Sequence, residues 1–306
     1  MILIEALAAS PAFFIASCAL LGLILGSFLN VVIYRLPIML EREWREQCAE
    51  LASGVPTAGP TASSSAAERF NLIVPRSACP ACKAPITALQ NIPIVSYVLL
   101  GGRCAACRAA ISVRYPLLEA LTGLLSALVG WRMGFGWPAL SALVFTWILI
   151  ALTFIDLDHQ LLPDKITVPL LWLGILLSLW HERWLGGSMP VDVRSSIIGA
   201  AAGYLSLWSV YHLFRLLTGK EGMGYGDFKL FAAIGAWLGW QMLLPTILVA
   251  AASGAIVGIT VIVAKRQGRE TPIPFGPFLA GAAWLMLMFG HELVAGYLGL
   301  FAAGAR

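Results

Sequence analysis

Long apolar runs separated by short polar segments dominate the pattern of hydrophobic and polar positions along the chain. A helix that crosses a bilayer needs about 20 mostly apolar residues. About eight runs meet or approach this length, at residues 11–34, 115–131, 138–155, 166–181, 195–217, 228–242, 244–264 and 275–298. The pattern therefore predicts an all-α polytopic membrane protein with about eight transmembrane helices.

One long polar interruption separates the first run from the second. Residues 35–114 hold nine of the 20 basic residues, and the tract from Ala52 to Ala67 is rich in Ala, Ser, Pro and Thr. We expect a flexible loop there, since such tracts lack large apolar groups, and we assign no role to the stretch 45–72. The chain then divides into a first transmembrane helix at 1–34, a small extramembrane domain at 35–114 and a transmembrane core at 115–306.

Composition supports the membrane assignment. The chain is 59% hydrophobic and 12% charged, against about 45–50% and about 25% in soluble domains. These values exclude a water-soluble enzyme and a disordered chain. The net charge of +4 is too small for a nucleic-acid binder, so membrane lipid is the expected surrounding and nucleic acid is no partner.

The distribution of Lys and Arg predicts the orientation, because cytoplasmic loops carry an excess of these residues. If 35–114 is cytosolic, the short loops on that side hold seven basic residues and the opposite side holds four. We therefore expect the domain at 35–114 to lie in the cytosol.

Two Cys-x-x-Cys pairs stand in this domain with 21 residues between them. That spacing is typical of a tetrahedral zinc site, and a site closed by four thiolates is structural because it leaves no position for a substrate. Two redox dithiols or four unrelated thiols are the alternative. The sequence predicts a small zinc-ribbon-like domain with one Zn²⁺ held by Cys79, Cys82, Cys104 and Cys107.

Carboxylates gather at the ends of two predicted membrane helices. Asp156, Asp158 and Asp164 follow the third run, and Asp227 precedes the sixth within Gly222-Met-Gly-Tyr-Gly-Asp227. Ionisable groups at membrane depth mark function by default, although Asp164 and Asp227 also suit helix N-caps. We expect the glycines at 222, 224 and 226 to permit positive φ angles and close approach of a substrate strand.

Two carboxylates brought together cannot both ionise, so one holds a proton while the other acts as a base toward water. This chemistry needs no covalent nucleophile. The chain has no G-x-S-x-G elbow and no H-E-x-x-H helix, which disfavours a serine hydrolase and a metalloprotease.

Taken together, these motifs resemble those of the bacterial prepilin peptidases (type IV leader peptidases), which are membrane aspartic proteases of the GxGD kind. Besides the Cys pairs and the two aspartate motifs, the resemblance rests on the segments Gly26–Pro37, Asn91–Pro93, Arg114–Glu119, Lys229–Leu230, Gly235–Gly239 and Pro274–Ala280. Their order along the chain is that of the family.

The resemblance implies that Asp156 and Asp227 are the catalytic pair, in the inner membrane of a bacterium with the active site facing the cytosol. It also implies type IV prepilins and type II secretion pseudopilins as substrates. Many members methylate the new amino terminus with S-adenosylmethionine, and the resemblance makes Gly102 a weak candidate for that site. The alternatives are a proton-coupled transporter and a non-catalytic scaffold of a pilus or secretion system.

Overall fold

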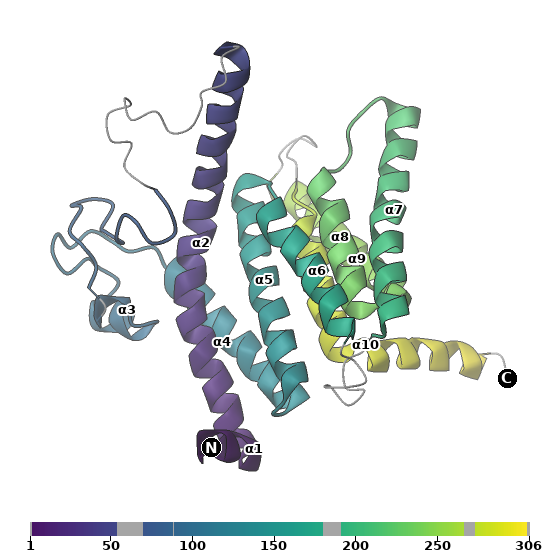
Figure 1. The fold of residues 1–306 in the computed structure, drawn as a ribbon, viewed down its shortest axis with the longest axis horizontal. Helices are drawn as coiled ribbons and strands as arrows, with labels where there is room; N and C mark the ends of the chain where they lie inside the picture. Colours follow the sequence, from purple (N-terminus) through teal and green to yellow (C-terminus); the bar gives the residue numbers. More distant parts are fainter. Residues whose placement is uncertain (1, 54–69, 88, 180–190, 266–272, 305–306) are drawn as a thin grey trace. The chain divides into compact units, whose positions relative to one another are not determined.

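The structure is a computed structural model that describes residues 2–53, 70–87, 89–179, 191–265 and 273–304. Its helices, shown in Figure 1, are α1 (Ile2–Ala9), α2 (Pro11–Ser53), α3 (Val95–Leu99), α4 (Arg114–Met133), α5 (Trp137–His159), α6 (Asp164–Leu179), α7 (Val193–Thr218), α8 (Tyr225–Leu238), α9 (Leu243–Lys265) and α10 (Gly276–Gly304), with 3-10 turns at Leu89–Asn91 and Trp240–Met242. The described residues contain two isolated β-bridges and no strand. The prediction of an all-α fold is confirmed.

Each of the eight predicted apolar runs coincides with a helix in its described part. Five of these helices are long and apolar enough to cross a membrane: α2, α5, α7, the segment Trp240–Val261 and α10. Helices α6 and α8 have 16 and 14 residues. The chain is thus a multi-pass membrane protein. The tract at Ala52–Ala67 falls almost wholly outside the described residues.

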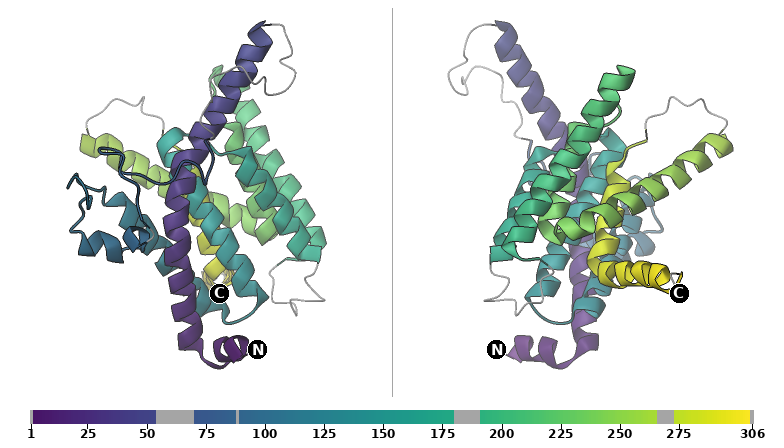
Figure 2. Two further views of the ribbon diagram at one scale, coloured as in Figure 1. Left: turned by 60° about the vertical axis from the view of Figure 1, so that its left-hand side comes forward. Right: turned by 90° about the vertical axis from the view of Figure 1, so that its right-hand side faces the viewer.

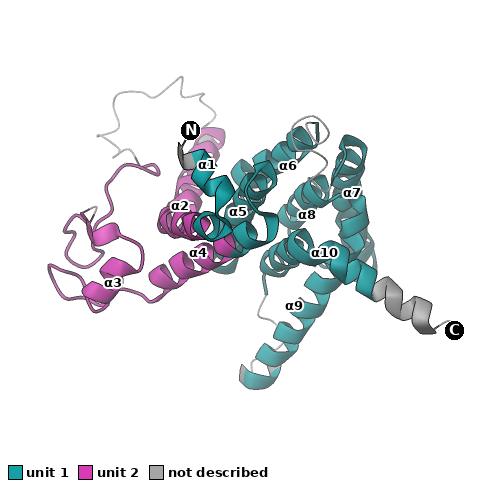
Figure 3. Cartoon of the chain, turned by 90° about the horizontal axis from the view of Figure 1, so that it is seen from below, with its two compact units in different colours: residues 1–15, 128–306 teal, residues 16–127 magenta. Residues whose placement is uncertain are grey.

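The chain forms two compact units, which Figure 3 colours separately: residues 16–127 in one, and residues 1–15 with 128–306 in the other. In the smaller unit, α2 and α4 pack through small residues. A Cβ built on Gly26 would lie 2.8 Å from the Cα of Glu119, and one on Gly123 would lie 2.9 Å from the side chain of Leu23. With Gly22, Gly26 forms a small-xxx-small pattern, which lets membrane helices approach closely.

Helix α2 continues beyond the predicted membrane segment at 11–34. It runs through Pro37 to Ser53 without a break. This extension is polar, and Arg45 donates to Glu41 at 3.2 Å across one helical turn, an arrangement that stabilises exposed helices. The apolar helix therefore carries a polar continuation into the segment expected outside the bilayer.

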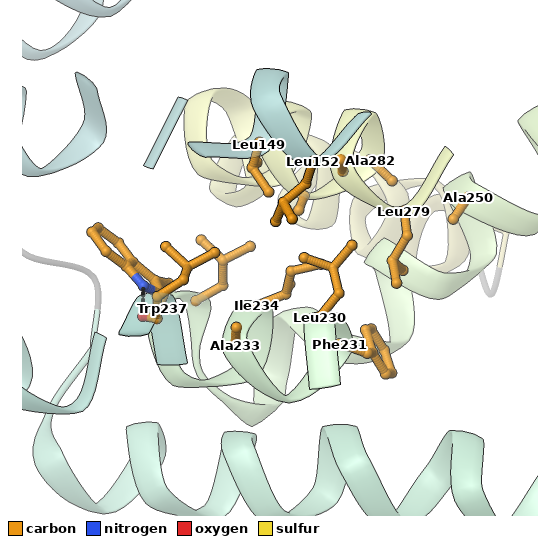
Figure 4. Close-up of a cluster of buried hydrophobic side chains, with 14 of the residues drawn as sticks. Leu149, Leu152, Leu230, Phe231, Ala233, Ile234, Trp237, Ala250, Leu279 and Ala282 are labelled. Carbon is orange, nitrogen blue, oxygen red and sulfur yellow. Dashed lines mark hydrogen bonds between the residues drawn. The ribbon is translucent and has the colours of Figure 1, made fainter. Parts of the chain in front are cut away.

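Helix α8 is the centre of the larger unit. It packs against α6, α7, α9 and α10, and nearly all of its side chains are buried. Figure 4 shows Leu230 and Ile234 directed toward Leu149 and Leu152 of α5, with Leu279 of α10 nearby. A helix that is apolar on every side belongs in a protein core, which explains why α8 can be too short to face lipid along its length.

Glycines bring α7 and α8 into backbone contact, and the two helices run side by side (Figure 1, Figure 2). A Cβ on either Gly199 or Gly235 would overlap the carbonyl of the other. The hydroxyl of Ser196 donates to the Ala236 carbonyl at 2.7 Å in the same interface. The position of α8 therefore depends on the absence of side chains at Gly199 and Gly235 of this seam.

We predict that Gly235→Ala destabilises the protein, because the new methyl group meets a backbone that cannot move aside. Overpacking of this kind costs about 1–3 kcal/mol. Thermal unfolding in detergent measures the change. Gly281→Ala is the matched control, since nothing lies within 4 Å of its built Cβ. Equal melting temperatures for the two variants would contradict the seam.

Candidate active site and cysteine cluster

Asp156 lies in the last turn of α5, where the helix is closed by a residue in the left-handed conformation. Gln160 has φ 52° and donates its backbone N–H to the Asp156 carbonyl at 2.9 Å. The Asp156 side chain is only 6% exposed. Its Oδ2 accepts the backbone N–H of Gly276 at 3.1 Å, so the start of α10 supplies a donor to this carboxylate.

Gly276 is required for that contact. A Cβ at this position would lie 2.5 Å from Asp156 Oδ2 and 3.1 Å from its Cγ. Any side chain would therefore push the carboxylate away from the N–H group that it accepts. The sequence places Gly276 in the motif Pro274–Ala280, but only the fold shows why a glycine stands there.

Asp227 is the third residue of α8, so it is not the N-cap residue. Gly224 is the N-cap residue, and the helix start has no side-chain cap hydrogen bond. The Asp227 side chain is 8% exposed, and among the described residues its Oδ1 has no hydrogen-bond partner. A buried polar atom without a partner calls for an explanation. The interpretation of Asp227 as an N-cap is wrong.

The two carboxyl groups lie on either side of one side chain, because Gly226, which precedes Asp227, and Gly276, which contacts Asp156, both pack against Leu162. Leu162, buried in the loop between α5 and α6, packs beside them. A Cβ on Gly226 would lie 2.7 Å from Leu162 Cβ, and one on Gly276 would lie 3.3 Å from Leu162 Cδ1. Leu162 thus fills the space between the starts of α8 and α10 and limits how the carboxylates can move.

An ion pair joins the first residue of α6 to the first turns of α8, near the two carboxyl groups. Lys229 Nζ donates to both carboxylate oxygens of Asp164 at 2.7 Å. Asp164 opens α6 and Lys229 follows Asp227 by two residues. The side chains are 60% and 34% exposed, so the pair is worth little in stability but fixes the register of the two helix starts. Asp158 and His159 are exposed at the end of α5.

The three glycines before Asp227 differ from the expectation. None of Gly222, Gly224 and Gly226 has a positive φ angle, so conformational freedom is not their role in this state. Close approach is the role of two of them. Gly226 packs on Leu162, and a Cβ on Gly222 would lie 2.9 Å from the Phe214 ring. Gly224 has room, with its nearest neighbour at 3.7 Å.

The four predicted cysteines converge in the smaller unit. The sulfur atoms of Cys79, Cys82, Cys104 and Cys107 all lie within 4.8 Å of one another. The two Cys pairs form equivalent turns. Cys79 N–H donates to the Ala84 carbonyl at 2.9 Å, and Cys104 N–H donates to the Ala109 carbonyl at 2.8 Å. The cluster can hold a metal ion, whereas Cys18 and Cys48 lie on α2 outside it.

Electrostatics within the cluster favour a cation. Backbone N–H groups of Cys82 and Ala81 lower the pKa of the Cys79 thiol to about 6. At Cys107 the N–H of Ala109 favours the thiolate, but the neighbouring thiols, Cys82 first, raise its pKa to about 11. The four groups thus cannot all ionise together unless a bound cation compensates their charge, as metal binding does.

Gly102 adopts φ 68°. Its N–H donates to the Tyr97 carbonyl at 2.9 Å, and its carbonyl accepts from Ile111 at 2.8 Å. A Cβ would lie 2.9 Å from the Tyr97 hydroxyl. Backbone conformation and packing against Tyr97 therefore account for this glycine without a cofactor.

Comparison with known proteins gives matches over most of the chain. Residues 143–259 match the "Type IV leader peptidase family", and residues 20–133 match the "Bacterial Peptidase A24 N-terminal domain". A protein of Aeromonas salmonicida, named "Prepilin leader peptidase/N-methyltransferase", is 53% identical over 97% of this chain and 98% of its own length. Proteins of the same name from Pseudomonas aeruginosa and Neisseria gonorrhoeae are each 48% identical, over 97% and 90% of both chains. No solved structure gives a significant match.

Proposed function

The chain belongs to the type IV leader peptidase family, and we propose that it is a membrane aspartic endopeptidase that removes the leader peptides of type IV prepilins and type II secretion pseudopilins. One observation carries the chemistry: two buried carboxyl groups share a site, and one oxygen of Asp227 has no hydrogen-bond partner among the described residues. In the proposed reaction a water molecule or the substrate supplies the hydrogen-bond partner that this buried oxygen lacks.

The surroundings of the two carboxyl groups suggest different roles. The Gly276 N–H donates to Oδ2 of Asp156 and holds this carboxyl group in one orientation, which suits a base that activates water. Asp227 has an oxygen without a donor, so it is better suited to hold the shared proton. In this scheme Asp227 protonates the tetrahedral oxygen or the leaving amine after water adds to the scissile carbonyl.

The excess of basic residues in the loops supports an active site at the cytosolic face of the bacterial inner membrane. Asp156 lies in the last turn of α5 and Asp227 in the first turn of α8, so both carboxyl groups lie near helix ends. A substrate whose leader stays in the cytosol while its apolar helix enters the membrane would present its junction at that depth.

A second step follows from the names of the relatives. We propose that the enzyme then methylates the new amino terminus, with S-adenosylmethionine as the methyl donor. The segment 35–114, between the helix at 1–34 and the core at 115–306, is the proposed cytosolic domain for this step. The packing that accounts for Gly102 gives no reason to place the cofactor there.

Zinc is the metal that fits the cysteine cluster best. Four thiolates at about 2.3 Å from a tetrahedral Zn²⁺ lie about 3.8 Å from one another, and Cys79 Sγ lies 3.8 Å from Cys107 Sγ. The ion would link the two turns of the domain, whose described residues form no β-strand that could do so. Its role is structural, because four protein ligands leave no open position.

We predict that Asp156→Asn and Asp227→Asn each lower prepilin cleavage by at least about 100-fold, the contribution typical of a general acid or base. The measurement is the size shift of a prepilin incubated with purified enzyme in lipid. Asp158→Asn is the control, since this carboxylate is exposed on the same helix. Near-normal cleavage by either of the first two variants would exclude the pair, and no cleavage by the unaltered protein would favour a transporter or a scaffold.

A comparison of Gly226→Ala with Gly224→Ala tests whether the glycine at 226 is needed because Leu162 leaves no room for a side chain, rather than for backbone flexibility. The first places a methyl group 2.7 Å from Leu162 Cβ, whereas the second has room. We expect Gly226→Ala to reduce kcat at least about tenfold through displacement of Asp227, on the scale that small misplacements cost. Gly224→Ala should stay near the unaltered rate. Equal rates in the same prepilin assay would show that Leu162 does not set the position of Asp227.

Metal analysis tests the cysteine cluster. We predict about one zinc per chain in the purified protein, the stoichiometry of a closed four-thiolate site, and none after Cys79→Ser with Cys82→Ser. Cys48→Ser, an exposed cysteine outside the cluster, should retain the metal. Methyl transfer should fall at least as much as cleavage in the double variant. An unaltered protein purified without chelators and free of zinc would contradict the assignment.

A further inference from the structure

An apolar segment of the smaller unit has exposed side chains, although it belongs to the polar interruption between the first and second predicted membrane helices. This segment, residues 89–100, is here called the apolar loop. Leu89, Val98 and Leu99 are 78%, 68% and 80% exposed, and Val95 is 50% exposed. Contiguous exposed apolar side chains mark a surface that meets a membrane or another protein.

A buried carboxylate ties this loop to the helix pair. Glu119 of α4 is 8% exposed, and its Oε2 accepts the backbone N–H of Ile94 at 2.8 Å. Ile94 has φ 61° and immediately precedes α3. Glu119 also interacts with the side chain of Ser27 on α2. The start of α3 is therefore fixed beside the packed part of α2 and α4.

The sequence pattern places this anchor beside the part of α2 that is expected to cross the membrane. Gly26 packs on Glu119 and belongs to the apolar run at 11–34, whose first following charge is Arg35. Arg35 lies nine positions after Gly26, which is roughly 13 Å of helix at 1.5 Å per residue. The loop is thus held alongside turns of α2 that are expected to be surrounded by lipid.

The backbone of the loop is suited to that place, because lipid offers no hydrogen-bond partners. Ser96, Val98 and Leu100 donate their N–H groups to carbonyls within the loop at 3.0–3.2 Å, and Gly102 donates to Tyr97 at 2.9 Å. Ile94 has its acceptor in Glu119. The exposed side chains of the loop are apolar, so lipid acyl chains can surround them without leaving a polar group unsatisfied.

Charge on either side of the loop points to the kind of lipid. Residues 70–118 contain no Asp or Glu. Five basic residues stand there, all exposed: Arg76, Lys83, Arg103, Arg108 and Arg114. Basic clusters beside a membrane helix attract anionic headgroups, at about 1 kcal/mol for each residue near the surface. A basic leader peptide or a second copy of this unit would be repelled by the same charges.

We propose that the apolar loop inserts into the boundary between headgroups and acyl chains of an anionic bilayer, with Val98 and Leu99 among the acyl chains and the basic residues among the phosphates. The cytosolic domain is then attached to the membrane surface along this edge. The proposal does not depend on the peptidase assignment.

Fluorescence quenching in nanodiscs tests this with the full chain. A genetically encoded fluorescent amino acid replaces Leu99, and in a second protein Leu51. These side chains are 80% and 85% exposed, but Leu51 lies near the polar end of α2. We expect doxyl-labelled phospholipid to quench the reporter at position 99 and iodide to quench the reporter at position 51. A reporter at Val98 repeats the test if the Leu99 replacement fails to fold.

Three results would overturn the proposal. Iodide quenching at position 99 as strong as at position 51 would place the loop in water. Shielding from both quenchers would mean that protein covers the loop. We expect lipid quenching at position 99 to increase when phosphatidylglycerol is added to phosphatidylcholine nanodiscs. This increase should be absent when Arg103→Gln and Arg108→Gln are combined. If phosphatidylglycerol leaves the quenching unchanged, the anionic preference is wrong.

Discussion

Helix α8 is buried on all sides, and the rest of the larger unit is arranged around it. Its seam with α7 leaves no room for a side chain at Gly199 or Gly235, and the Trp237 indole donates to the Leu170 carbonyl of α6 at 2.8 Å. These contacts fix both the rotation and the height of the helix. Because Asp227 is in the first turn of α8, the same packing decides where this carboxyl group points.

The cost of burying Asp227 is explained by the proposed chemistry. A helix core is a poor place for a polar atom without a partner, and structural needs alone would favour an apolar residue at this position. A site in which two carboxyl groups share a proton and orient a water molecule needs such an environment. Leu162, Gly226 and Gly276 then act as spacers between the carboxyl groups, and one buried oxygen of Asp227 is left without a hydrogen-bond partner among the described residues.

The sequence was informative wherever a feature is local. Apolar runs predict helices because their length and composition suffice, and the Cys-x-x-Cys spacing predicts a cluster because each pair folds within a single turn. Proximity of Asp156 and Asp227 was expected from topology and resemblance. The exposure of the polar residues Asp158 and His159 at the end of α5 also follows from the sequence, because charged and polar side chains favour water.

Contacts between distant segments were not predictable in this way. Nothing in the sequence pairs Lys229 with Asp164, Gly276 with Asp156, or Ile94 with Glu119, since each depends on how whole helices pack. The same applies to the glycines before Asp227. A Gly-rich motif suggests unusual backbone angles, but here the backbone is ordinary and the constraint at Gly226 comes from the neighbouring Leu162.

The central claim is that Asp156 and Asp227 act as one catalytic unit. The most direct test compares the residual cleavage rates of the Asp156→Asn, Asp227→Asn and double variants. Residues that act together show strongly non-additive effects, so the double variant should be no slower than the slower single variant. Losses that multiply in the double variant would contradict the account, because they would show two groups contributing independently.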